Sequence, residues 1–152
     1  MSVQVSPSIT LQDLVYHPKC AGLGIVNVPP EEHLPNLIRL CQEVGQPIFD
    51  LLHNKVQVIS GYRNPQLQTA LVRQGRNSLP HEEGRALDFQ TPGMDVSEGF
   101  DLIAASQIPF DSLTWFWNRA GNNWIEVTIP RDGEEPRRLA RRCVKMAERV
   151  FL

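Results

Sequence analysis

Hydrophobic residues recur at steps of three and four between Glu31 and His53. The positions are Leu34, Leu37, Ile38, Cys41, Val44, Ile48, Leu51 and Leu52. This spacing puts them on one face of a helix, and we expect that face to be buried. Pro47 lies inside the segment. Because a proline removes a backbone hydrogen bond and crowds the preceding turn, we expect the helix to be kinked or divided there.

Four later segments alternate polar and apolar residues or are rich in β-branched and aromatic residues, as strands are. They are residues 55–60, 85–90, 111–117 and 123–129. The last two are separated by a short segment containing Asn and Gly, which favours a hairpin. We expect residues 8–16 to form a short helix or an irregular segment.

Two further helices are indicated by their first residues. Asn64 and Pro65 provide a cap and a first-turn proline for a helix running to about Gln74, and Asp95 precedes a helix over residues 96–106. Helices come first along the chain, followed by a small sheet with helices interspersed. This order predicts an α+β fold, a small antiparallel sheet with helices packed on it.

The composition limits the functions that the chain can have. Its 152 residues suffice for one domain, and 41% hydrophobic and 21% charged residues are typical of a folded protein. A net charge of -2 disfavours binding of nucleic acid through bulk positive charge. No apolar run is long enough to span a bilayer, so we expect no membrane span. The first residues lack a basic segment and an apolar run, which predicts synthesis in the cytoplasm without a signal peptide.

The basic residues gather near the end of the chain. Residues 137–152 contain six Lys and Arg and a single acid, Glu148, so the remainder of the chain is acidic. Helical spacing separates these cations from Leu139, Cys143 and Met146, and we therefore expect a basic amphipathic helix within residues 131–152, appended to a body over 1–130. Such a helix either packs on its own domain with a solvated arginine face or docks on another chain, a nucleic acid or an anionic surface.

The stretch from His81 to Asp88 carries the most informative chemistry. Asp88 lies within a predicted strand whose neighbours are apolar, and a buried carboxylate needs a cation or a set of donors. Imidazole nitrogen and carboxylate oxygen are both normal zinc ligands. On spacing alone, a metal site competes with a surface histidine and a carboxylate satisfied by other partners.

The wider pattern resembles the zinc D-alanyl-D-alanine carboxypeptidase family, which also contains phage-encoded peptidoglycan endopeptidases. The family motif SGYR is present at residues 60–63, and H-x-x-G-x-A-x-D is present at residues 81–88. The resemblance covers residues 8–130 and implies the carboxypeptidase-like fold. It also implies that His81 and Asp88 are zinc ligands, and that Arg63 and Ser78 contact substrate, Arg63 through a substrate carboxylate.

Two positions depart from the family pattern. The third ligand, a histidine in the family's W-x-H strand, is Glu126 here, and the family's general base aligns with Phe116. A second anionic ligand makes zinc a weaker Lewis acid, and a phenylalanine cannot accept a proton. General acid–base catalysis typically contributes about 10²–10⁴-fold. Glu126 can replace the missing base only by leaving zinc with two protein ligands.

Three hypotheses follow from these departures. The first is a catalytically degenerate protein, with zinc absent or weakly bound, that serves as a structural or docking component of a phage virion or phage-derived assembly and contacts other chains through its basic C-terminal helix. The second is an active zinc carboxypeptidase or endopeptidase that cleaves peptidoglycan stem peptides, with Glu126 catalytic. The third is a module that binds peptidoglycan peptides, or DNA through the arginine face, without chemistry.

Other polar and aromatic residues have simpler explanations. His17, His33 and His53 lie far in sequence from any second ligand, and we expect surface or capping roles for them. The consecutive aromatic residues Trp115, Phe116 and Trp117 place rings on both faces of a strand, which modestly favours an interface on one of them. Three cysteines without C-x-x-C spacing indicate reduced thiols.

Overall fold

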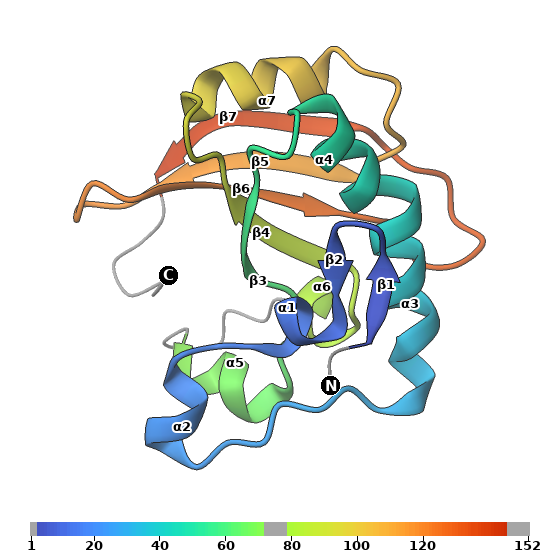
Figure 1. The fold of residues 1–152 in the computed structure, drawn as a ribbon, viewed down its shortest axis with the longest axis vertical. Helices are drawn as coiled ribbons and strands as arrows, with labels where there is room; N and C mark the ends of the chain where they lie inside the picture. The colour runs from blue at the N-terminus through green and yellow to red at the C-terminus, as the bar shows by residue number, and fades with distance from the viewer. Residues whose placement is uncertain (1–2, 72–78, 146–152) are drawn as a thin grey trace.

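The computed structural model describes residues 3–71 and 79–145, and its centre is a five-stranded sheet in the order β3-β4-β6-β5-β7 (Figure 1). The strands are β3 (Gln57–Ser60), β4 (Ala86–Gln90), β5 (Ser112–Trp117), β6 (Asn123–Thr128) and β7 (Leu139–Lys145), and β1 (Gln4–Ser6) and β2 (Ile9–Thr10) form a separate pair. This confirms the α+β class and all four predicted strands. The sheet is mixed rather than purely antiparallel, because β7 runs parallel to β5.

The helices surround this sheet. They are α1 (Leu11–Val15), α2 (Lys19–Leu23), the 3-10 turn η1 (Glu31–His33), α3 (Leu34–Arg39), the π-helical η2 (Leu40–Gly45), α4 (Gln46–Leu51), α5 (Pro65–Leu71), α6 (Leu79–Glu82) and α7 (Val96–Ala104). None of the helices in the described ranges is long and apolar enough to cross a bilayer.

The predicted long helix is present but changes its winding before Pro47. The turns from Leu40 to Gly45 are π-helical, and an α-helix resumes at Gln46. Pro47 has no N–H to donate, and its ring crowds the carbonyl four residues earlier, so a wider turn accommodates it without ending the helix.

The two faces of the sheet differ in chemistry. One face presents apolar side chains, among them Leu87, Phe89 and Ile125, and it packs against α3, η2, α4 and α7. In Figure 1, α7 lies above the strands, α4 lies beside their right-hand ends, and α1, α5 and α6 lie below them. Successive residues of a strand point to opposite faces, so Asp88 and Glu126 belong to the other face. We call that face the polar face.

The end of the described chain corrects the prediction of a basic C-terminal helix. Residues Leu139–Lys145 form β7 at the edge of the sheet, and residues 146–152 lie outside the described part. The helical spacing of Leu139 and Cys143 was misleading, because backbone pairing with β5 and side-chain contacts to the body favour an extended chain.

The basic side chains of this segment attach β7 to its own domain. Arg137 donates to Asp111 at 2.9 Å, Arg142 pairs with Asp101, and Lys145 lies 5.5 Å from the centre of the Trp117 ring. For these cations the structure agrees with the interpretation in which the segment packs on its own domain.

Candidate metal centre

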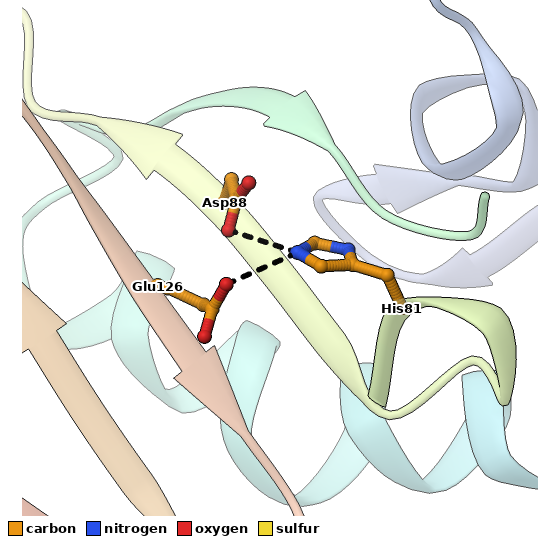
Figure 2. A group of neighbouring side chains, drawn as sticks. All are labelled: His81, Asp88 and Glu126. Carbon is orange, nitrogen blue, oxygen red and sulfur yellow. Dashed lines mark hydrogen bonds and ion pairs between the residues drawn. The ribbon is translucent and has the colours of Figure 1, made fainter. Parts of the chain in front are cut away.

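Three of the predicted site residues meet on the polar face (Figure 2). His81 comes from α6, Asp88 from β4 and Glu126 from β6. The Nε2 atom of His81 lies 3.2 Å from Asp88 Oδ1 and 3.2 Å from Glu126 Oε2, and one ligand atom from each residue lies within 4.8 Å of the other two. The fold thus brings together His81 and Asp88 with Glu126, the residue at the position where the resemblance implies a third ligand.

Strand pairing and one turn create this cluster. Asp88 and Glu126 are directly opposite in the antiparallel pair of β4 and β6, so their side chains share a face. Gly84 turns the chain between α6 and β4 with a φ of +75°, and a Cβ there would lie 3.0 Å from Leu37 Cγ. A glycine is therefore needed for α6 to fold back and hold His81 over Asp88.

The orientation of the imidazole is set by a backbone carbonyl. His81 Nδ1 lies 2.7 Å from Gly61 O, and because a carbonyl only accepts, Nδ1 carries the proton and donates. Nε2 then points toward the two carboxylates. A histidine whose second nitrogen donates to a backbone carbonyl is the usual arrangement for a metal ligand.

Arg63 occupies a different place from the one that the resemblance implies. Its side chain is buried, with 4% of the residue exposed, and it donates to Asp88 Oδ2 at 2.7 Å, to Ser60 Oγ at 2.7 Å and to Gln68 Oε1 at 3.3 Å. These contacts commit the guanidinium to Asp88 rather than to an incoming ligand. Ser78, the other predicted substrate contact, lies outside the described residues.

The charges of the cluster stabilise one another in the metal-free protein. Burial and the Arg63 guanidinium lower the pKa of His81, but the attraction of Asp88 and the contacts with both carboxylates outweigh them and raise that pKa to about 9. Burial favours the neutral form of Asp88, yet His81 and Arg63 hold the pKa of its carboxyl below the ordinary value.

The donor set fits a divalent cation. Asp88 Oδ1 is buried and receives no hydrogen bond from the described residues, although Nε2 of His81 is 3.2 Å away. One imidazole nitrogen offers one proton, whereas it faces two carboxylate oxygens. Tetrahedral zinc with bonds of about 2.0–2.1 Å sets its ligand atoms about 3.3 Å apart. The distances from His81 Nε2 to the two carboxylate oxygens, 3.2 Å each, are close to this value. A cation at this point would satisfy all three residues together.

Phe116 lies on the same face as the cluster. Thr114 is paired with Glu126, and two residues further along β5, Phe116 is paired with Trp124. The rings of Phe116 and Trp124 are 5.5 Å apart. At the position where the family resemblance implies a proton acceptor, an aromatic side chain therefore packs on another aromatic side chain.

Sequence reasoning missed some neighbours of the cluster. His17 is 4% exposed rather than on the surface, and its Nδ1 accepts from the backbone N–H of Lys19, which is a capping contact. Burial, followed by the charges of Arg63 and Lys19, lowers the pKa of His17 to about 4. Gln68, which holds the Arg63 guanidinium, has no signal in the sequence beyond its place on the predicted helix after Asn64.

Comparisons with known protein families, with curated proteins and with solved structures gave no match.

Proposed function

We propose that this chain is a catalytically degenerate relative of the zinc D-alanyl-D-alanine carboxypeptidases and phage endopeptidases. In this proposal, the pocket of His81, Asp88 and Glu126 binds zinc weakly, and the protein serves as a structural or docking component of a phage virion or phage-derived assembly. The proposal adopts the carboxypeptidase-like fold that the SGYR and H-x-x-G-x-A-x-D motifs imply.

The position of Phe116 carries the proposal. Bound zinc would polarise an amide carbonyl and acidify a bound water in such a site. Hydrolysis also needs a group that accepts the proton of that water and delivers it to the leaving amine. Phe116 has no such group, and its ring packs against Trp124.

Glu126 does not restore the lost base while it serves as a ligand. Its Oε2 atom lies 3.2 Å from His81 Nε2, and its side chain is only 21% exposed. As a ligand it adds a second negative charge beside Asp88, so a bound zinc carries less net positive charge and is a weaker Lewis acid. As a base it would leave two protein ligands.

The edge of the sheet supports a docking role. β7 is the last strand of the sheet, and its outer side pairs with none of the other strands in the described ranges. An edge strand exposes unpaired backbone groups that another chain can meet. Leu139 on this strand is also exposed.

A hydrolysis assay with a restored variant tests the proposal. Purified protein with zinc is incubated with peptidoglycan stem peptides, and products are followed by mass spectrometry. We expect no turnover by the wild type and measurable turnover by the double variant Phe116→Glu with Glu126→His, which reinstates the family pattern.

Turnover by the wild type that a chelator abolishes would refute the proposal that the protein is catalytically degenerate. It would establish the alternative, an active zinc-dependent carboxypeptidase or endopeptidase. One observation favours that alternative. The Nε2 atom of His81 lies 3.2 Å from an oxygen of Asp88 and 3.2 Å from an oxygen of Glu126, and neighbouring ligand atoms of a zinc site are about this far apart.

The docking role is tested separately by mass spectrometry of purified particles, which should contain the chain in a fixed ratio to the other components.

A further inference from the structure

The three residues of the metal pocket are held in place by different means. Asp88 and Glu126 are fixed by the backbone pairing of β4 with β6, where they lie directly opposite each other. His81 comes from α6, a helix of only four residues, and its ring reaches toward these strands (Figure 2). Because a single helical turn is not stable by itself, contacts outside α6 decide where the imidazole lies.

The end of α6 is closed by a backbone motif. The N–H of Arg85 donates to Pro80 O at 2.7 Å, and the N–H of Gly84 donates to His81 O at 3.3 Å. These two bonds, with a glycine of positive φ after the last helical turn, are a common C-terminal cap. The motif places the side chains on either side of the glycine in contact, because Arg85 Nε donates to Glu83 Oε1 at 2.8 Å.

Glu83 connects this turn to the segment that follows β6. Its Oε1 atom also accepts from Arg131 Nε at 3.3 Å, and its Oε2 atom accepts from Arg131 Nη2 at 3.2 Å, which makes this ion pair bidentate. Arg85 makes a second connection, because its Nη1 donates to Ile129 O at 2.9 Å. Ile129 and Arg131 lie just after the end of β6. The turn after α6 is therefore bound to the chain after β6.

A third contact ties the same turn to α3. Asn36 donates from Nδ2 to the backbone oxygen of Glu83 at 2.8 Å. Arg39, also on α3, donates to Asn36 Oδ1 and to Pro130 O, both at 3.1 Å. Three segments thus meet at Glu83, namely α3, the turn after α6 and the chain after β6. The Glu83 side chain is largely covered at this junction, whereas its partner Arg131 is more exposed.

We propose that Glu83 is a positioning residue of the metal pocket. Its bonds with Arg131 and Arg85 hold the turn after α6 against the chain after β6, which keeps the imidazole of α6 at ligand distance from the carboxylates on β4 and β6. Removing a group that holds a metal ligand in place commonly weakens metal binding by about 10–100-fold. Since Glu83 acts through the backbone and not by a hydrogen bond to the imidazole, we expect an effect at the lower end of that range. The inference rests on the metal pocket of the proposed function and not on the loss of catalysis.

The zinc affinity of the full chain and its variants tests the proposal. The dissociation constant for zinc is measured by competition with a chromophoric chelator, at neutral pH and well below the unfolding temperature. We expect Glu83→Ala to bind zinc about tenfold more weakly than the wild type. Arg131→Ala should also weaken binding, and Arg131→Lys, which keeps the charge but loses the fork of donors, should lie between Arg131→Ala and the wild type.

Glu82→Ala is the matched control. Glu82 lies one residue nearer to His81, and its side chain makes no hydrogen bond or ion pair in the part of the chain that the structure describes. Both variants remove one negative charge beside the pocket, so a loss of affinity caused by charge alone would be equal in the two. We expect Glu82→Ala to stay within about twofold of the wild type.

Hydrogen exchange of the metal-free protein gives a second measurement. The N–H of Arg63 donates to His81 O at 3.2 Å, and the N–H of Arg85 donates to Pro80 O, so both amides report on the position of α6. In Glu83→Ala they should exchange severalfold faster, while the amides of β4 and β6 keep their wild-type rates.

Two results would overturn the proposal alone while zinc still binds to the wild type. The first is an unchanged zinc dissociation constant in Glu83→Ala, even if the free energy of unfolding falls, because Glu83 would then be merely structural. The second is an equal loss of affinity in Glu83→Ala and Glu82→Ala. A wild type that binds no zinc would instead refute the metal pocket of the proposed function together with this inference.

Discussion

Asp88 illustrates how one buried charge organises the site. Its Oδ2 atom accepts from Arg63 at 2.7 Å, and its Oδ1 atom faces His81. Both members of the Asp88–Arg63 pair are buried. Removing one partner of such a pair leaves an uncompensated charge in a poorly solvated place, which costs far more than losing an exposed pair.

We expect Asp88→Asn to lower the free energy of unfolding by about 3 kcal/mol in chemical denaturation, because the buried guanidinium of Arg63 loses its counterion. Asp132→Asn, on an exposed turn, makes the same chemical change and should stay within about 0.5 kcal/mol of the wild type. Similar losses in both variants would show that the buried pair contributes little.

The stability of the metal-free protein should fall as the pH rises from about 6.5 to 9. The pKa of His81 is raised to about 9 in the folded protein, so its stabilising charge is fully present below its unfolded pKa of 6.5 and is lost as the pH passes through 9. The total change corresponds to roughly 3 kcal/mol.

Urea denaturation at several pH values with a chelator present measures this dependence. His81→Gln should abolish it, and His53→Gln, at an exposed histidine, should preserve it. A His81→Gln profile that matches the wild type would locate the pH dependence elsewhere.

At the residue scale, the sequence predicted which groups meet but not all of their roles. His81 and Asp88 match a motif of the family that the chain resembles, and Glu126 stands where that family has its third ligand, a histidine. The ion pair between Arg63 and Asp88 forms because Ser60, three residues before Arg63, is paired with Asp88 across β3 and β4. No local signal sets that alignment, since the two residues lie 28 positions apart in the chain.

At the scale of elements, β7 shows where a periodic pattern misleads. Its residues have helical spacing, yet the segment is held as a strand by contacts at its start. Asp111 accepts from the backbone N–H and the guanidinium of Arg137, and the Asp111 carbonyl accepts from the N–H of Leu139. Tertiary contacts of this kind override a local preference.

Asp111→Ala should loosen β7 while leaving the other strands intact. Hydrogen exchange of the amides of residues 139–145 should become severalfold faster, and exchange in β4 and β6 should be unchanged, because local opening exposes only the edge strand. Asp101→Ala removes a more exposed partner of the same segment and should have a smaller effect. Equal acceleration throughout the sheet would instead indicate global destabilisation.

The elements that were predicted correctly have strong local signals. The hairpin of β5 and β6 and the start of the helix after Asn64 follow from turn and cap residues, and the Asn64 side chain does accept from the N–H of Leu67. The predicted end of that helix near Gln74 lies outside the described residues. The parallel pairing of β7 with β5 has no such signal, because it joins segments that are distant in the sequence.

At the scale of the whole molecule, the cluster links separate parts of the chain. α6, β4 and β6 each contribute one ligand, so a cation that binds all three stabilises the folded state by mass action. At a concentration one hundred times its dissociation constant, zinc would add about 2.7 kcal/mol.

We expect zinc at that concentration to raise the melting temperature by about 5–10 °C, given about 2–4 °C per kcal/mol for a chain of this size. Thermal scans with zinc and with a chelator measure the shift. His81→Ala should lose it, and His53→Ala should keep it. An equal shift in His81→Ala would place the bound zinc at another site.

The contact of Asp88 with Arg63 and His81 also has a consequence for how the sheet assembles. If β4 slipped by one residue, the carboxylate would turn into the apolar core, so the charged network penalises misaligned sheets even when no reaction takes place. Correct alignment of β4 therefore gives these side chains a role in folding that is independent of any reaction at the site.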